Sequence, residues 1–191
     1  MRQEHYNHEE FLRRRLKRWK FQTPIGIICR RATTKIGIIF SLVSPRVAAV
    51  VFRTWLNGWC TGRRFQNPAL KCQLACSPNA DDSIEHYMRC PVVAGFSQAC
   101  LHLDANTGDI AQSFMCLDKN EDDGTVVLRA LLVYATYCAT NGMRHSSARG
   151  SSLNMQELLL QHVHQGTYNH SCSQHVVSTM YNRRRTRLRT E

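Results

Sequence analysis

The chain has 191 residues, and its 25 Lys and Arg against 14 Asp and Glu give a formal net charge of +11. Hydrophobic residues make up 43% and charged residues 20%, values near globular averages that exclude wholesale disorder. Five Pro and ten Gly exclude a collagen-like or Pro-rich low-complexity chain, and the length suits one domain with tails.

The positive charge comes mostly from arginine, with 20 Arg and only 5 Lys. The planar guanidinium donates paired hydrogen bonds to phosphates and to base edges, so this excess favours a polyanionic partner. We therefore expect a nucleic acid, RNA or DNA, as the partner, and we expect neither a membrane nor a small-molecule substrate.

Residues 1–35 are predicted to form a basic arm that contains three consecutive arginines. Apolar side chains at near-helical spacing predict a short amphipathic helix over residues 7–20. Residues 36–43, with the sequence IGIIFSLV, form a β-rich apolar run. Their periodicity fits either a short buried strand or the start of a helical core, and this choice stays open.

A helical pattern begins at residue 46 and is expected to stop at Asn57-Gly58. Residues 59–82 are rich in turn-forming and basic residues, and residues 83–100 are predicted to be helical with an interruption near Pro91. The first of these helices is expected to have five apolar side chains on one face, namely Val47, Val50, Val51, Trp55 and Leu56.

The best predicted core helix covers residues 126–141 and follows a polar, acidic stretch over 104–124. Asp123 or Thr125 can cap its start, and Asn141-Gly142 is expected to close it.

Four parts of the chain follow from these patterns. They are the arm 1–35, a helical domain 36–142 with a zinc-binding segment 53–91, a linker 143–152, and a C-terminal part 153–191. The last part holds an amphipathic helix over about 153–164 and an Arg-rich tail. The predicted fold is mainly α: a small helical domain around a Cys3His loop-helix, with basic N- and C-terminal arms.

The start of the chain is polar throughout and does not resemble a secretory signal peptide. Its longest apolar stretches are too short to span a bilayer. Nine cysteines in a chain of this kind favour a reducing compartment, where clustered Cys and His bind metal more often than they form disulfides. We expect an intracellular and nuclear protein.

The clearest motif is Cys72-x3-Cys76-x9-His86-x3-Cys90. Structural zinc sites take four thiolate or imidazole ligands at tetrahedral corners, and Cys3His is a common set. Cys72 and Cys76 bracket a short turn that can bring two thiolates to one ion. Because these four ligands leave no coordination position open, we expect Zn²⁺ with a structural role and no catalytic residue at the metal.

The second half of the motif is predicted to be helical. His86 and Cys90 stand at i and i+4, so they would share one face of a helix. Asp82 and Glu85 form a capping-box-like pair at its start. The alternative is that the cysteines are ordinary thiols and that His86 is a surface residue. A weaker set of possible ligands in the tail consists of His162, His164, His170, Cys172 and His175.

Residues 53–91 resemble the zinc-binding segment at the C-terminal end of non-LTR retrotransposon reverse transcriptases. In that family a helix and a Trp-Gly-Thr-like turn precede a Cys pair, and a Glu-His-aromatic-x-x-Cys-Pro stretch completes the site. The matching residues here are RTWLNGWCTGRRF over 53–65, the pair Cys72 and Cys76, and DSIEHYMRCP over 82–91. The family often has four residues between the His and the last Cys, whereas this chain has three.

The resemblance implies a retroelement-derived module that grips nucleic acid beside a polymerase, without polymerase activity of its own. A polymerase holds two Mg²⁺ ions with adjacent aspartates on a hydrophobic hairpin. Asp81-Asp82 and Asp122-Asp123 both lie in polar turns, so we interpret them as solvated charges or helix caps.

Basic residues near the motif and in the two arms are the candidate nucleic-acid-binding set, and Trp59, Phe65 and Tyr87 offer aromatic faces for stacking. Two other functions stay open: a protein-interaction zinc module whose arms serve nuclear targeting, and a nuclease-type enzyme fragment. The candidate basic residues are Arg63, Arg64, Lys71, Arg89, Arg13, Arg14, Arg15, Arg183, Arg184 and Arg185.

Overall fold

The computed structural model describes residues 8–103, 108–119, 121–145 and 154–187, and side chains within these ranges up to residue 179. The prediction of a mainly helical fold is confirmed, and the described residues form no strand. The elements are α1 (His8–Leu16), the 3-10 helix η1 (Lys17–Trp19), α2 (Ile25–Leu42), α3 (Pro45–Trp55), α4 (Ile84–Tyr87), α5 (Pro91–Leu101), α6 (Ile110–Phe114), α7 (Asp123–His145), α8 (Met155–Thr167) and α9 (Ser171–Arg187).

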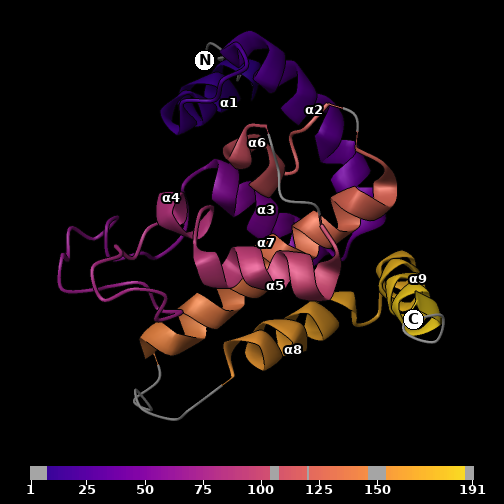
Figure 1. Ribbon diagram of the computed structural model, residues 1–191. Coiled ribbons are helices and arrows are strands. Elements are labelled where there is room, and N and C mark those ends of the chain that lie inside the picture. Colours follow the sequence, from indigo (N-terminus) through magenta and orange to yellow (C-terminus); the bar gives the residue numbers. More distant parts are fainter. Residues whose placement is uncertain (1–7, 104–107, 120, 146–153, 188–191) are drawn as a thin grey trace.

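The helix α7 crosses the middle of the molecule (Figure 1). The helices α3 and α8 pack against it, and α5 packs against both α7 and α8. The helices α1 and α2 pack against each other at one end, and the long loop between α3 and α4 projects from the side of the molecule (Figure 1). No helix of the described residues is both long enough and apolar enough to cross a membrane.

Residues 36–43, which the sequence left open between strand and helix, belong to the C-terminal half of the 18-residue helix α2 and the residue that follows it. One face of α2 is buried along its whole length, through Ile28, Ala32 and Ile39. The buried side chains of this face recur at helical spacing on both sides of residue 35. The predicted boundary between the N-terminal arm and the helical domain, after residue 35, therefore falls inside α2.

The basic segment before α2 is helical, as predicted, and it is anchored to the core. Leu16 and Trp19 are buried, and the indole Nε1 of Trp19 donates a hydrogen bond to the carbonyl oxygen of Trp55 (2.9 Å). Because two apolar side chains hold this segment, its arginines are carried on an ordered support.

The helix α3 confirms its predicted buried face and its predicted end. Four of its five expected apolar residues are buried, whereas Leu56 is half-buried and follows the last residue of the helix. Trp55 donates from Nε1 to the carbonyl oxygen of Met115 (2.9 Å). Beyond the helix, Asn57 takes a positive φ of 53°, and the Gly58 amide bonds back to the Arg53 carbonyl oxygen.

The helix α7 is longer than predicted at its C-terminal end. Its cap is Asp122, whose Oδ1 accepts from the Thr125 amide (3.0 Å), and neither Asp123 nor Thr125 has that role. The predicted stop at Asn141-Gly142 is wrong, because the helix continues to His145. The added turn carries Arg144, whose guanidinium makes a buried ion pair described below.

Of the remaining elements, α8 was predicted, whereas the helices α6 and α9 were not. The apolar island over 114–117 within the acidic stretch is buried and follows the short helix α6, whose cap is Asp109. The predicted helix over 153–164 corresponds to α8, and Asn154 caps its start. Residues 146–152 of the predicted linker lie outside the described residues, and the Arg-rich segment continues helix α9 as far as Arg187.

The helices α7 and α8 approach each other closely at Gly166. A Cβ at this position would lie 2.7 Å from Leu131 Cδ2 and 3.0 Å from Tyr134 Cδ1. We expect Gly166→Val to lower the free energy of unfolding by about 1–3 kcal/mol through overpacking. The matched control is Gly37→Val in α2, where a Cβ would meet nothing within 4 Å. Chemical denaturation of both variants measures the difference, and equal stabilities would contradict the close packing.

Candidate metal centre

Cys72, Cys76, His86 and Cys90 come together as the sequence predicts. One ligand atom from each lies within 4.8 Å of all the others. The Cys72 and Cys90 Sγ atoms are 4.0 Å apart, and Cys76 Sγ lies 3.2 Å from His86 Nε2. Tetrahedral zinc with Zn–S of ~2.3 Å and Zn–N of ~2.0 Å gives ligand separations of roughly 3.5–3.8 Å. These four residues could therefore hold a metal ion, and their number and chemistry suit zinc.

The first two ligands are brought together by a turn. The Ala75 amide donates to the Cys72 carbonyl oxygen (3.1 Å), and Ala75 takes a positive φ of 52°. The Cys72 amide in turn donates to the Ala80 carbonyl oxygen (2.8 Å). This second bond returns the chain toward Cys72 after the turn, so the backbone itself places both thiols on one side.

The other two ligands are positioned differently from the prediction. The helix α4 ends at Tyr87, and Cys90 is the extended residue that precedes α5, with φ −63° and ψ 125°. The prediction of one helix carrying His86 and Cys90 is therefore wrong. The reason is Pro91, whose ring disfavours a helical conformation in the residue before it and which begins α5 instead.

The predicted helix cap of this segment, formed by Asp82 and Glu85, is also wrong. Ser83 caps α4, because its side-chain oxygen accepts from the His86 amide (3.1 Å). Neither Asp82 nor Glu85 takes part in this bond.

The Cys90 thiol lies in surroundings that favour its thiolate. The hydrogen bond from Cys72 lowers the pKa of Cys90, and although burial raises it, the amides of Val93 and Val92 lower it further. These amides belong to the first turn of α5, where backbone N–H groups lack helical partners. Because thiolates are the species that bind zinc, this arrangement suits a metal ligand.

The environment of Asp82 differs from the prediction. It was expected to be a solvated charge or a cap, but it is fully buried. Its Oδ2 and Oδ1 accept from Arg144 Nε (2.7 Å) and Nη2 (2.8 Å), which is a two-point ion pair. The partners stand 62 residues apart, so no local pattern in the sequence indicates the contact.

The Asp82 carboxylate also accepts from Tyr87 Oη at 2.6 Å and from the Gly62 amide at 2.8 Å. Burial raises the pKa of Asp82, but the hydrogen bonds from Arg144, Tyr87 and Gly62 lower it more, and the net pKa lies below the ordinary value. Gly62 has no room for a side chain, since a Cβ would lie 2.6 Å from Leu70 Cβ. Asp82, at the end of the α3–α4 loop, is thus linked to α4, to α7 and to the start of the same loop at Gly62.

The three aromatic candidates divide between core and surface. Trp59 and Tyr87 are fully buried, and the Trp59 indole donates to Thr54 Oγ1 (2.9 Å). Phe65 is 62% exposed, so of the three it alone offers a free ring face.

Three arginines gather on the surface beside the candidate site. Arg18 Nη2 and Arg63 Nη1 lie 3.9 Å and 4.0 Å from the two carboxylate oxygens of Glu85. Arg64 donates to the Asn57 carbonyl oxygen, and the Asn57 amide oxygen can accept from both terminal nitrogens of Arg18 (3.1 and 2.8 Å). We call Arg18, Arg63 and Arg64 the arginine cluster. Arg18 was not among the predicted residues, because its proximity arises from the packing of η1.

The other basic candidates are more dispersed. Lys71 is paired with Asp81 (3.8 Å), and Arg89 is exposed beside Cys90. On α1, Arg13 and Arg14 face Glu9 and Glu10 at 3.4 and 3.9 Å, and Arg15 lies over the Phe11 ring. Arg183, Arg184 and Arg185 belong to α9, and their side chains lie outside the described ones.

The weaker ligand set of the tail does not form a second site. Within the described ranges, no His, Cys, Asp or Glu group other than the Cys3His set is close enough to hold a metal. His170 instead accepts a hydrogen bond from the Ser173 amide through Nδ1 (3.3 Å).

Fold and site together define a small, mainly helical protein with a candidate Cys3His metal centre. No protein-family model, curated protein or solved structure matches the chain. The resemblance to reverse transcriptases therefore remains a prediction from the motif over residues 53–91.

Zinc content tests the metal centre directly. We expect about one zinc per chain in protein purified without added metal, and close to none in a Cys76→Ser/Cys90→Ser variant, because two thiolates are removed. A Cys60→Ser/Cys100→Ser variant changes two cysteines outside the cluster and should keep its zinc. Elemental analysis gives the result, and a metal-free, folded parent would refute the site.

Removing the Asp82 carboxylate tests the ion pair. Asp82→Asn leaves the Arg144 charge buried without a counter-ion, and we expect a loss of about 3–5 kcal/mol in unfolding free energy at pH 7. Because the folded pKa of Asp82 is depressed, its contribution is complete above the unfolded pKa of ~4 and is lost as the pH falls through the folded value. The stabilities of the two proteins should thus begin to converge below about pH 4 and become equal only below the folded pKa of Asp82. Asp81→Asn, at an exposed position, is the control.

Proposed function

We propose that this chain is a zinc-stabilised nucleic-acid-binding module of a retroelement-derived protein, located in the nucleus. The observation that carries the proposal is the arginine cluster, which lies beside the candidate metal centre and next to the exposed ring of Phe65. Guanidinium groups that bind phosphates next to an aromatic face on which a base can stack are typical of single-stranded nucleic-acid recognition.

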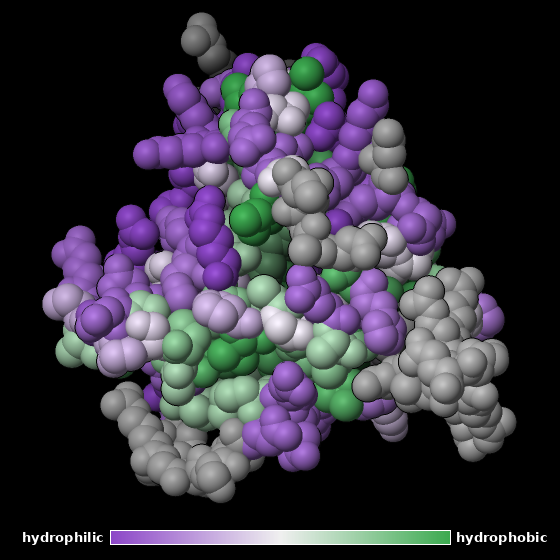
Figure 2. Space-filling view, viewed as in Figure 1, coloured by the Kyte–Doolittle hydropathy of each residue, from purple (hydrophilic) through white to green (hydrophobic). Residues whose placement is uncertain are grey.

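The charge balance at the cluster supports a polyanionic partner. Arg18 and Arg63 share one carboxylate, that of Glu85, through two long ion pairs, and Arg64 donates to the neutral Asn57 carbonyl oxygen. Hydrophilic side chains cover the side of the molecule where the α3–α4 loop projects (Figure 2). The formal net charge of +11 adds a long-range attraction of the same sign.

The proposed role of zinc is to hold this surface in place. Residues 56–83 between α3 and α4 contain turns and one isolated bridge, between Lys71 and Asp81. A segment with so little regular structure depends on its internal ties, and structural zinc supplies on the order of 10 kcal/mol in small modules. Arg63 and Arg64 lie in this segment, so their placement would depend on the metal.

No catalytic step is part of the proposal. Four protein ligands fill a tetrahedral zinc, which leaves no position for substrate or water. The Asp82 carboxylate is occupied by Arg144, and Asp122 caps α7, so each candidate aspartate pair has one member committed to structure.

A second candidate, a protein-interaction zinc module, is favoured by an apolar cleft next to Cys90. The cleft measures about 360 Å³ and lies between α5, α6 and α7. Hydrophobic side chains are visible over α5 (Figure 2), and Arg89 at the rim suits a partner with an apolar and an acidic side chain. Its lining includes Met88, Val93, Leu103, Ile110 and Phe114.

Salt dependence separates the two candidates. We expect single-stranded RNA or DNA to bind with log Kd varying linearly with log salt, and Arg63→Gln and Arg64→Gln each to reduce the slope by about one. Arg46→Gln, an exposed arginine at the start of α3, is the matched control and should leave the slope unchanged. Fluorescence anisotropy at several salt concentrations measures the slopes. Binding that is absent, or insensitive to both substitutions, would refute the proposed interface and favour the second candidate.

A further inference from the structure

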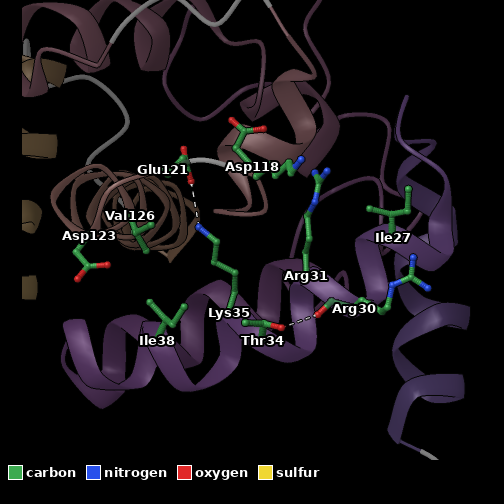
Figure 3. A pocket seen from close by; sticks show the side chains of 11 residues that line it. Ile27, Arg30, Arg31, Thr34, Lys35, Ile38, Asp118, Glu121, Asp123 and Val126 are labelled. Atoms are coloured by element: carbon green, nitrogen blue, oxygen red, sulfur yellow. Dashed lines mark hydrogen bonds and ion pairs between the residues drawn. The ribbon is translucent and has the colours of Figure 1, made fainter.

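A polar cavity of about 360 Å³ lies far from the metal centre, between α2 and the segment that leads into α7 (Figure 3). Its α2 wall carries Arg30, Arg31 and Lys35. The opposite wall is lined by Asp118, Lys119, Glu121, Asp123 and Val126. It borders the first turn of α7, whereas Arg144 is in the last turn. Arg144 is 21 positions after Asp123 on this helix, which corresponds to about 30 Å.

Arg31 is held in this cavity by neutral groups. Its Nη1 donates to Gln112 Oε1 (2.9 Å) and to the Leu117 carbonyl oxygen (3.5 Å). The Gln112 amide is itself fixed, because its Nε2 donates to Asp109 Oδ2 (2.8 Å). These bonds fix the position of the Arg31 guanidinium but do not neutralise its charge. The Nε and Nη2 atoms of Arg31 make no hydrogen bond to a described residue.

The carboxylates of the cavity are already paired. Glu121, whose side chain is 6% exposed, lies 3.7 Å from Lys35 Nζ and also contacts Arg129 Nε. Figure 3 shows the Lys35 ammonium directed at Glu121 across the cavity. Asp118 is 3.6 Å from Arg129 Nη1 and accepts from the Ser113 hydroxyl. The charges of Lys35 and Arg129 therefore balance those of the two carboxylates.

Three further cations at the cavity have no such partner. Arg30, Arg31 and Lys119 lie within 4 Å of no described carboxylate, although all three line the cavity. Asp123 is the one remaining carboxylate of the lining, and it is exposed at the start of α7. The cavity consequently has an excess of about two positive charges, and one of its arginines is preorganised.

We propose that this cavity binds a phosphate monoester, carried either by a free nucleotide or by the end of a nucleic-acid strand. A phosphate monoester has a charge of about −1.5 to −2 at neutral pH and three acceptor oxygens, which match the unpaired charge and the free fork of Arg31. The exposed Arg30 and Lys119 would close over the same group. Binding of the phosphate at the end of a nucleic-acid strand rests on the proposed function, whereas binding of a free nucleotide does not.

Direct titration tests the cavity without reference to the metal centre. The probes are inorganic phosphate and adenosine monophosphate, with binding followed by calorimetry or NMR. We expect Arg31→Gln to weaken binding at least tenfold, because it removes a charged donor pair. Arg30→Gln/Lys119→Gln changes only exposed side chains, so it should keep the parent melting temperature and still weaken binding about tenfold. Arg46→Gln is again the control and should bind like the parent.

A matched pair of oligonucleotides, with and without a 5′-phosphate, separates the two sources. A preference for the phosphorylated strand that is lost in Arg30→Gln/Lys119→Gln supports a strand end. Binding of adenosine monophosphate without such a preference supports a free nucleotide. No binding of either phosphate together with equal affinity for both strands would overturn the proposal. That outcome leaves the arginine cluster untouched, since Arg63→Gln and Arg64→Gln report on it separately.

Discussion

The architecture around the candidate metal centre depends on one buried carboxylate. Asp82 has no exposed surface, and it accepts hydrogen bonds from a guanidinium, a phenol and a backbone amide. Each donor comes from a different part of the fold: Arg144 from α7, Tyr87 from α4 and Gly62 from the beginning of the α3–α4 loop. A buried charge of this kind is tolerated only when its lone pairs are filled, so the three donors are fixed relative to one another. The candidate ligands Cys72 and His86 lie between Gly62 and Tyr87 in the chain, so their positions depend on these contacts.

The same principle distinguishes the two charged regions of the molecule. Around Asp82 each carboxylate oxygen has two donors, and the result is a rigid internal tie. Around Glu121 the carboxylate meets Lys35 and Arg129 as ion pairs, but neither oxygen has a partner in hydrogen-bonding geometry. A closed network such as that around Asp82 is typical of a structural joint, whereas an anion site needs unpaired donors, which in this region are the Nε and Nη2 atoms of Arg31.

The sequence allowed the Cys3His cluster and most helices to be predicted because their signals are local. The Cys3His spacing, the apolar face of α3 and the turn at Asn57-Gly58 all depend on residues a few positions apart. The errors arose where a distant contact or a neighbouring ring decided the outcome. Pro91 moved Cys90 out of a helix, and the pairing of Arg144 with Asp82 accompanies an α7 that continues past Gly142. Arg18 could not be associated with Arg63 from sequence, since Trp19 determines where its segment packs.

The Asp82–Arg144 pair also determines which parts of the chain fold as a unit. The two residues are separated by 62 positions, and the four candidate metal ligands all precede α5. The last turn of α7 is therefore tied to a region that lies much earlier in the chain. Local opening of that turn would remove Arg144 and leave the Asp82 carboxylate buried without its counter-ion, which couples the unfolding of the turn to that of the α3–α4 loop. The motif over residues 53–91 is thus shorter than the cooperative unit that contains it, and hydrogen-exchange protection of the two regions would rise and fall together.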